Sequence, residues 1–401
     1  MLTTSISIEQ DGFGYVPKEN SKSNAGLFNI VRRYTLTNKK KASVRLISWG
    51  ASIQSVRIPN KDGVLGDVVL GYDSMDGYLN NRYFGNIIGR VANRVAEGLI
   101  YINGKKYELT KNDENQKNHI NGGIYGFDNV NWDSCVSGKQ VVMSNLSKTG
   151  SEGYPGHMLT QVKYTWTDLN ELHINIRATS TEATPANITN YCLFNLAGHG
   201  MGVKELRKHI VTINADKWTL MDIRDNLPIG LIEPVDQTVY DLRTPTQLNK
   251  QTMYNVPGGG YNHNLCITTP SCWCYRFHAR ILHPDSGRFL EVYSNQPGLQ
   301  FYTGNDLPDP NRNYPPDHDD YYWGGCGDSP DKTEQNTNVS NKNLYFPGKD
   351  GVLYRRHGGF VLSPQNYPDA VNIESFPSCI LHPGKMYTHD MTYRFGVRSK
   401  M

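Results

Sequence analysis

Hydrogen-bonding side chains that do not titrate near neutral pH stand out in short stretches of this chain. Asn93 and Arg94 are adjacent, and Gln300 lies in the run Gln-Pro-Gly-Leu-Gln-Phe-Tyr-Thr-Gly-Asn. Amide and guanidinium groups recognise hydroxyl groups through hydrogen bonds, and this recognition needs no general base. The structural alternatives are a buried arginine that ties loops together and a glutamine that bonds across strands. Such residues indicate a small, polar partner that carries hydroxyl groups.

Composition narrows the class of partner. The 401 residues are 38% hydrophobic and 20% charged, with a net charge of +3. This is enough apolar material for a core and too little positive charge to indicate nucleic acid. No apolar run approaches the roughly 20 residues of a membrane helix. We therefore expect a small-molecule partner, no nucleic acid and no membrane span.

The beginning of the chain bears on its location. Met1-Leu2-Thr3-Thr4-Ser5 lacks the charged start and apolar block of a signal peptide. The default expectation is therefore a cytoplasmic location. Three glycosylation triplets, at Asn145, Asn187 and Asn338, keep an extracellular location open.

The sequence gives little support for a metal site or for disulfide bonds. The seven cysteines show no zinc-type Cys-x-x-Cys spacing, and an odd number cannot all pair within one chain. Buried free thiols are expected. The acidic stretch 317–320 (Asp-His-Asp-Asp) lacks the glycine-punctuated pattern of a calcium loop. Neither a metal ion nor a cofactor is expected.

The elements that must position the polar groups read as β-strands. In 161–177, Val162, Tyr164 and Trp166 alternate with polar residues, a turn follows, and Leu172 to Ile176 alternate again. Period two on both sides of a turn predicts an antiparallel hairpin. Residues 43–59 predict two strands that break near Gly50, and only 73–82 suggests a short helix. The same strand pattern recurs at 208–219, 273–282, 288–302 and 388–398. We predict an all-β fold, a large antiparallel β-sandwich that forms one domain over residues 1–401.

Several motifs resemble those of the galactose mutarotase (aldose 1-epimerase) family. They occur in the family's order over roughly residues 45 to 398. The resemblance implies a large antiparallel β-sandwich with one sugar-binding cleft, in which Asn93, Arg94 and Gln300 contact sugar hydroxyls. The matching stretches are Gly89–Arg94, Asn187–Gly198, Leu220–Arg243, Gly260–Asn264, Gln296–Asn305 and Pro368–Ala370.

The family resemblance also implies a chemistry. A glutamate accepts the proton of the anomeric hydroxyl while a histidine protonates the ring oxygen, so that the ring opens and closes again as the other anomer. In this sequence Ser363 stands at the glutamate position and Tyr191 at the histidine position. A serine hydroxyl is a poor base, and a phenol with a pKa of about 10 is a poor proton donor at neutral pH.

Two further positions differ from the family pattern. Asn262 replaces an aspartate and Asn121 replaces a second histidine. All four changes remove a group that titrates between acid and neutral pH. The sequence therefore favours a non-catalytic homologue that binds a monosaccharide or a glycan. The residues assigned to its cleft are Asn93, Arg94, Asn121, Tyr191, Asn262, Gln300 and Ser363.

Two alternatives stay open at this point. His119 lies two residues before Asn121, so on an extended segment both would face one way, and His119 could stand in for the lost histidine of a weak or altered aldose 1-epimerase. The other alternative is a protein-interaction module that uses an insertion at about 306–350. His263 and His357 match positions kept around the family site, and we expect both to be structural.

The insertion carries its own candidate contacts. Its aromatic side chains could stack on a sugar or meet a partner protein, and the alternative is a solvated acidic loop. These aromatic residues are Tyr314, Tyr321, Tyr322 and Trp323.

Overall fold

Alternating side chains build the centre of the molecule. In β13 (Met158–Trp166) and β14 (Glu171–Ser180), Val162 pairs with Ile176 and Tyr164 with Ile174, and all four side chains are fully buried. Their strand neighbours face outward and are partly exposed. The hairpin predicted at 161–177 is thereby confirmed, since period two places every second residue on the core face.

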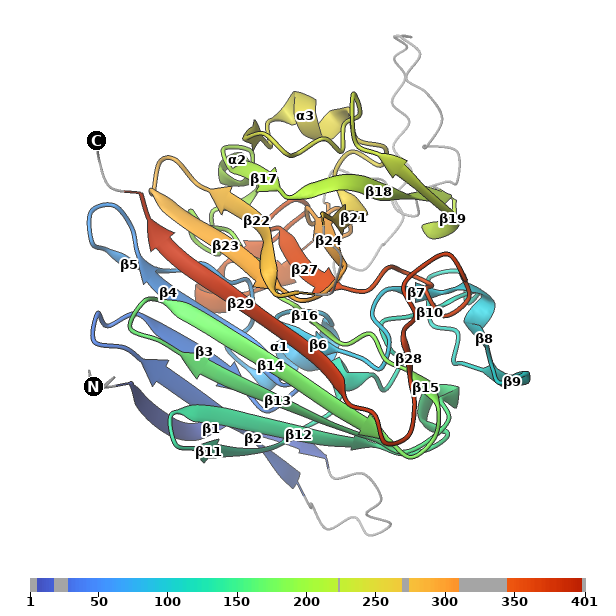
Figure 1. The fold of residues 1–401 in the computed structure, drawn as a ribbon. Helices are drawn as coiled ribbons and strands as arrows, with labels where there is room; N and C mark the ends of the chain where they lie inside the picture. The colour runs from blue at the N-terminus through green and yellow to red at the C-terminus, as the bar shows by residue number, and fades with distance from the viewer. Residues whose placement is uncertain (1–5, 18–27, 223, 269–273, 310–344, 399–401) are drawn as a thin grey trace, which may run out of the picture.

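The computed structural model describes residues 6–17, 28–222, 224–268, 274–309 and 345–398. Within these ranges the largest sheet has nine strands, and all neighbouring strands in it run antiparallel (Figure 1). Its strands, in spatial order, are β11 (Asp133–Ser137), β12 (Gln140–Ser147), β13, β14, β29 (Tyr387–Val397), β23 (Arg288–Ser294), β22 (Arg276–Leu282), β17 (Ile210–Ile213) and β20 (Thr246–Gln247).

Two five-stranded sheets pack on this central sheet. The first joins the N-terminal strands in sequence order, and its Tyr34 and Leu46 share one core with Val162 and Tyr164. The strands of this sheet are β1 (Ser7–Pro17), β2 (Phe28–Thr37), β3 (Ser43–Ile47), β4 (Ser52–Pro59) and β5 (Leu65–Asp67). Sheets stacked over shared apolar side chains form a β-sandwich, so the predicted fold class is confirmed.

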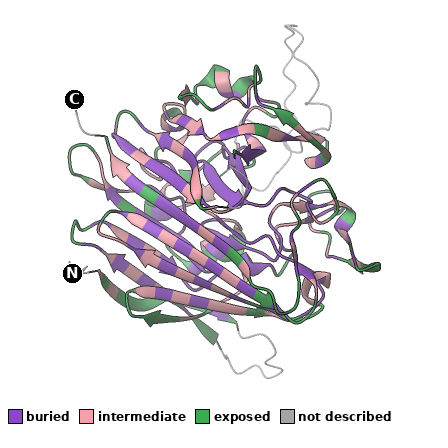
Figure 2. Cartoon of the chain, in the orientation of Figure 1, coloured by how far each residue is buried: buried purple, intermediate pink, exposed green. Residues whose placement is uncertain are grey.

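The second five-stranded sheet carries the polar motifs. Phe301 and Leu362 on its inner face join the same core, which holds the sheet against the central one. Figure 2 shows the buried strands of this region as purple ribbon above the central sheet. Its order is β19 (Leu227–Pro234), β18 (Ala215–Asp222), β21 (Asn262–Ile267), β24 (Gly298–Tyr302) and β27 (Val361–Gln365).

Short elements connect the sheets at one end. The expected helix at 73–82 is α1 (Met75–Asn80). The other helices are α2 (Gly202–Leu206), α3 (Lys250–Tyr254) and the 3₁₀ turns Ala96–Gly98, Phe127–Asn129, Ser151–Gly153 and Lys349–Gly351. The paired short strands are β6 (Asn86–Ile88) with β16 (Thr189–Tyr191), β7 (Arg94–Val95) with β10 (His119–Ile120), β8 (Leu99–Ile102) with β9 (Lys105–Glu108), β15 (Thr184–Pro185) with β28 (Ile380–Leu381), and β25 (Phe346–Pro347) with β26 (Leu353–Tyr354).

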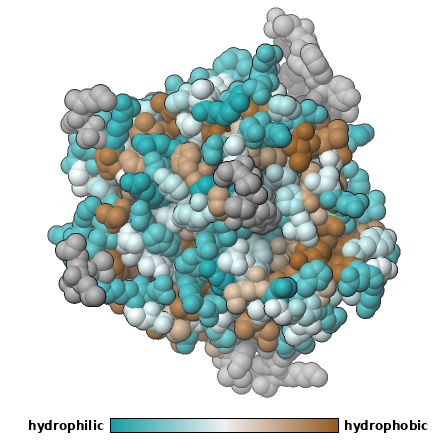
Figure 3. Space-filling model, viewed as in Figure 1, coloured by the Kyte–Doolittle hydropathy of each residue, from teal (hydrophilic) through white to brown (hydrophobic). Residues whose placement is uncertain are grey.

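Several smaller expectations can be compared with the structure. Of the described cysteines, all five are free thiols; Cys135 is exposed, which corrects the expectation of burial there. Asn187 is 2% exposed and bonded to Asn366, so its glycosylation triplet is inaccessible. The described residues contain no helix long and apolar enough to cross a membrane. The face in Figure 3 is largely hydrophilic with scattered apolar groups.

Part of the predicted insertion lies outside the described residues. These are residues 310–344, which include its four aromatic candidates and the acidic stretch 317–320. Its described ends, 306–309 and 345–350, flank the cavity discussed next.

Candidate functional site

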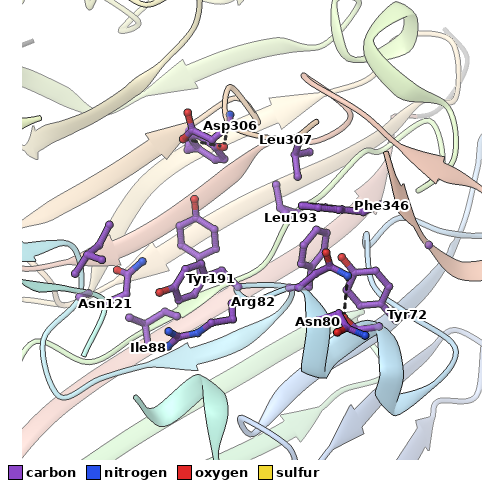
Figure 4. Close-up of a pocket in the computed structure, with 18 of the residues that line it drawn as sticks. Tyr72, Asn80, Arg82, Ile88, Asn121, Tyr191, Leu193, Asp306, Leu307 and Phe346 are labelled. Carbon is purple, nitrogen blue, oxygen red and sulfur yellow. Dashed lines mark hydrogen bonds between the residues drawn. The ribbon is translucent and has the colours of Figure 1, made fainter. Parts of the chain in front are cut away.

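A cavity of about 1020 Å³ opens between the sheet that holds β21, β24 and β27 and the short strands beside it. Six of the seven residues assigned to the cleft from sequence line it: Asn93, Arg94, Asn121, Tyr191, Asn262 and Gln300. These residues come from six different strands and loops, and Figure 4 shows several of them around the opening.

The pairing of β7 with β10 positions the first group. Ile120 lies opposite Arg94, and the backbones of Asn93 and Asn121 bond to each other, with Asn121 N donating to Asn93 O over 2.9 Å. Asn121 Oδ1 in turn accepts from Asn93 N at 2.8 Å. The guanidinium of Arg94 has no hydrogen bond or ion pair within the described chain. Arg94 is therefore held by its backbone while its charged group stays available to a ligand.

The second group comes from three adjacent strands of one sheet. Gln300 pairs with Asn264 on β21 and with Ser363 on β27, so its side chain shares their face of the sheet. Gln300 Nε2 donates to Asn262 Oδ1 at 2.9 Å. Gln365 lies two residues after Ser363, shares that face, and also lines the cavity.

Two buried atoms of this group have no partner. Gln300 Oε1 and Gln365 Nε2 make no hydrogen bond to any described residue, although the two side chains are 4% and 3% exposed. Leaving such a group unpaired costs about 1–3 kcal/mol. One atom accepts and the other donates, but both are shielded from the cavity, so a ligand or water would reach them only after the side chains turn. Gln365 was missed from sequence, and its signal was the alternation that places residues 363 and 365 on one face.

Ser363 does not line the cavity. Its side chain is fully buried, its Oγ donates to Asn190 O at 3.0 Å, and it lies 2.8 Å from Thr189 Oγ1. Thr189 itself lines the cavity. The expectation that Ser363 contacts the ligand is therefore corrected: the side chain is too short to pass Thr189 and forms part of the layer beneath the floor.

Tyr191 lies among other aromatic rings. Its ring centroid is 6.3 Å from that of Tyr83 and 6.1 Å from that of Tyr302. Burial raises the pKa of Tyr191 well above that of a free phenol, and the nearby Asp306 carboxylate raises it further. Burial also raises the pKa of Tyr83 to about 12. These phenols remain neutral at physiological pH, so they can donate hydrogen bonds and are reluctant to release a proton.

His119 is turned away from the cavity. Its Nδ1 donates to Thr110 O at 2.6 Å and its Nε2 accepts from Tyr154 Oη at 2.6 Å. Burial lowers its pKa to about 4. Both ring nitrogens are occupied, so the position of His119 does not support its role as a substitute histidine.

The hydrogen bonds of His263 and His357 also indicate structural roles. The Nε2 of His263 donates to Tyr240 Oη at 3.2 Å, and the Nδ1 of His357 donates to Thr303 O at 2.7 Å. No histidine is among the described residues that line the cavity.

Acidic side chains dominate the charge of the cavity. Arg82 is paired with the buried Asp128 through bonds of 2.8 Å, which leaves Arg94 as the unpaired cation among the described lining residues. This balance disfavours an anionic ligand. The lining carboxylates are Asp73, Asp76, Asp113, Glu114 and Asp306.

A cluster that could attract a metal ion lies elsewhere. Ligand atoms of Glu205, His283 and Asp285 lie within 4.8 Å of one another. The ammonium of Lys208 already bonds to Glu205 Oε1 and Asp285 Oδ2 at 2.8 Å each. The Lys208 ammonium therefore already neutralises the carboxylates of this cluster.

The stacked antiparallel sheets define a β-sandwich protein with one polar-lined cavity beside its second five-stranded sheet. The aldose 1-epimerase family model matches residues 32–394. The galactose mutarotase of Rattus norvegicus is 38% identical over 394 residues, which cover 98% of this chain and 99% of that protein. The galactose mutarotase of Homo sapiens is 39% identical over 355 residues, 88% of this chain and 91% of that protein. The chain belongs to the aldose 1-epimerase family.

Solved structures agree on the fold. A GalM/aldose epimerase homologue from C. elegans has a TM-score of 0.73 at 24% identity, covering 90% of this chain and 97% of that one. Galactose 1-epimerase from Lactobacillus acidophilus has a TM-score of 0.72 at 21% identity, covering 98% and 99%. Since both identities are low, these likenesses support the β-sandwich alone.

Proposed function

We propose that this chain binds a neutral sugar in the cavity. The observation that carries the proposal is that the Arg94 guanidinium and the amide side chains of Asn121, Asn262 and Gln365 line one hollow. A sugar presents adjacent hydroxyl groups that both donate and accept, so one ring can bond to several of these groups. Because the lining is acidic, we propose that the sugar carries no phosphate group.

We further propose that the bound sugar does not change its anomeric form at a useful rate. Ring opening requires a base at the anomeric hydroxyl and an acid at the ring oxygen, and each such group contributes typically 10² to 10⁴ in rate. Ser363 lies beneath Thr189, and Tyr191 has a raised pKa. Neither residue is suited to the transfer of a proton at neutral pH.

Aldose 1-epimerase activity is the second candidate function. Family membership favours it, as does 38% identity over 98% of the chain to a protein named galactose mutarotase. In that case the proton-transfer groups would come from the titratable side chains that line the cavity, such as Asp306. A third reading, protein interaction through the insertion, concerns residues that are mostly outside the described ranges.

Calorimetric titration with galactose and with glucose tests the proposal, with anomer exchange followed by NMR on the same samples. We expect binding to wild type, unchanged binding to the exposed-site control Arg57→Ala, and loss of binding in Arg94→Ala. Exchange at the buffer rate supports the first reading. Binding with accelerated exchange supports the epimerase instead, and the absence of binding to either sugar contradicts both.

A further inference from the structure

The cavity continues past its polar end into an apolar half. Leu193, Leu307 and Phe346 line it together with Phe84 and Tyr72. Figure 4 shows Leu193, Leu307, Phe346 and Tyr72 on one side of the view, with Asn80 beside Tyr72, and Asn121, Arg82 and Tyr191 on the other. The apolar half therefore has an apolar wall, and polar side chains such as Asn80 also line it.

The apolar wall is fixed by the core behind it. Tyr72, Phe84, Leu193 and Leu307 are all less than 10% exposed and belong to one hydrophobic cluster, against which Phe346 packs. Phe84 meets the ring of Phe346 edge-on at 6.1 Å. A wall held by packed aromatic rings keeps its shape, so this half is pre-formed.

Size and charge limit what can occupy both halves. A volume of about 1020 Å³ lies at the top of the range for pockets that enclose drug-sized ligands, and a single hexose is much smaller. A hexose in the polar half would leave the partly exposed ring of Phe346 in contact with water, which is unfavourable. The carboxylates Asp73, Asp76 and Asp306 around the cavity exclude a phosphate as the additional group.

We propose that the ligand is a glycoside, a sugar whose anomeric oxygen carries an uncharged aromatic or aliphatic group that lies in the apolar half. This inference rests on the proposed sugar site. A glycoside has no free anomeric hydroxyl, so its recognition requires no proton transfer. The apolar half and the residues Tyr191 and Ser363 are thus explained by the same ligand.

Calorimetric titration of the full chain with galactose and with methyl and phenyl galactopyranosides of both anomeric forms tests the inference. We expect one phenyl galactoside to bind roughly tenfold more tightly than its methyl counterpart, because its ring buries apolar surface. Phe346→Ala and Leu307→Ala should remove this gain, measured as the ratio of phenyl to methyl galactoside affinity within each variant. Phe28→Ala, a matched change at a 59% exposed phenylalanine outside the cavity, should preserve the gain.

The outcomes separate the inference from the proposed function. Equal affinity for the methyl and phenyl galactosides of each anomeric form would contradict the proposal that the ligand is a glycoside. It would leave the proposed sugar site intact. Failure of every sugar and glycoside to bind overturns the proposed function itself. Tighter binding of galactose 1-phosphate than of the phenyl galactosides contradicts the inference, since it would place an anion where we place an apolar group.

Discussion

Arg94 and Arg82 both line the cavity, but their guanidinium groups have different surroundings. Arg82 is consumed by a buried carboxylate, Asp128, whereas Arg94 has no such partner in the described chain. A sequence motif that ends in arginine cannot distinguish these two cases, because the difference depends on which residues the fold brings to the guanidinium. The free charge of Arg94 is the reason that we propose it as a contact of the sugar.

Gln365 offers a test in which binding and stability separate. Replacing it with Met removes a buried donor that has no partner, so the free energy of unfolding should stay level or rise by about 1 kcal/mol. Sugar affinity should fall roughly 5-fold or more, by the loss of one hydrogen bond. Urea unfolding and calorimetry measure the two effects.

The adjacent Asn366 is the matched comparison. Its Nδ2 donates to Pro377 O at 2.8 Å and its Oδ1 accepts from Tyr367 N at 2.7 Å, away from the cavity. Asn366→Leu should lower the free energy of unfolding by about 1–3 kcal/mol. If Gln365→Met destabilises the protein as much as Asn366→Leu does, the role of Gln365 is structural.

Restoring mutarotase activity should require more than one substitution. In Ser363→Glu a carboxylate enters a fully buried site beside Asn190 O, so we expect lower stability by several kcal/mol and no mutarotase activity. Pro364 also restricts the backbone of residue 363 to extended conformations. We predict activity only when Asn121→His, Tyr191→His, Asn262→Asp, Ser363→Glu and Pro364→Thr are combined.

Coupled enzymatic or NMR measurement of anomer exchange checks this set. Asn262→Asp keeps the acceptor that Gln300 Nε2 uses, so the fivefold variant should retain the sugar site. Activity of the single variant equal to that of the fivefold one would refute the account. So would a folded fivefold variant that binds galactose and remains inactive.

At the scale of elements, a tight loop holds the polar end of the cavity. Gly122 has a φ of +87°, and a Cβ there would lie 1.8 Å from Gly89 O. The backbone of Gly122 therefore packs directly on the neighbouring segment and keeps Asn121 opposite Asn93. Only glycine combines this φ with such a close approach.

Gly122→Ala should consequently lower both stability and sugar affinity. We expect a loss of about 2 kcal/mol or more in the free energy of unfolding, since strain and a backbone clash add. Gly104→Ala is the control: its φ of +77° is similar, but nothing lies within 4 Å of the added Cβ. Thermal unfolding that shifts equally in both variants would show that φ alone matters and that the close approach does not.

Long strands were easier to predict from the sequence than the short strands around the cavity. The hairpin at 161–177 repeats its period over nine and ten residues of strand, which is a strong local signal. β16 and β27 carry Tyr191 and Gln365 but have three and five residues, and their faces are set by the sheets that they join. His119 and Ser363 were misjudged for this reason, because neighbours distant in sequence determine where each side chain ends.

At the scale of the whole molecule, buried histidines link stability to pH. Burial lowers the pKa of five of them to about 3 or 4: His119, His209, His263, His357 and His389. Each remains neutral when folded and gains a proton near pH 6.5 when unfolded. The amount that these histidines contribute to the free energy of unfolding is fully present above pH 6.5 and is lost as the pH falls toward 4.

The free energy of unfolding should therefore drop between pH 6.5 and 4, by about 1.4 kcal/mol per pH unit for each histidine that is neutral only when folded. Asp369, whose pKa burial raises to about 6, acts in the opposite direction with a single group. Urea midpoints at several pH values measure the slope. A flat profile would contradict the assigned burial of these histidines.

The measurement that tests the account most directly is the rate of galactose anomer exchange at a sugar concentration that calorimetry shows to saturate the cavity. Wild type should bind galactose and leave exchange within about twofold of the buffer rate, because no suitable acid and base flank the sugar. Acceleration that rises in proportion to protein concentration, and that disappears in Arg94→Ala, would contradict the account and establish the chain as an aldose 1-epimerase.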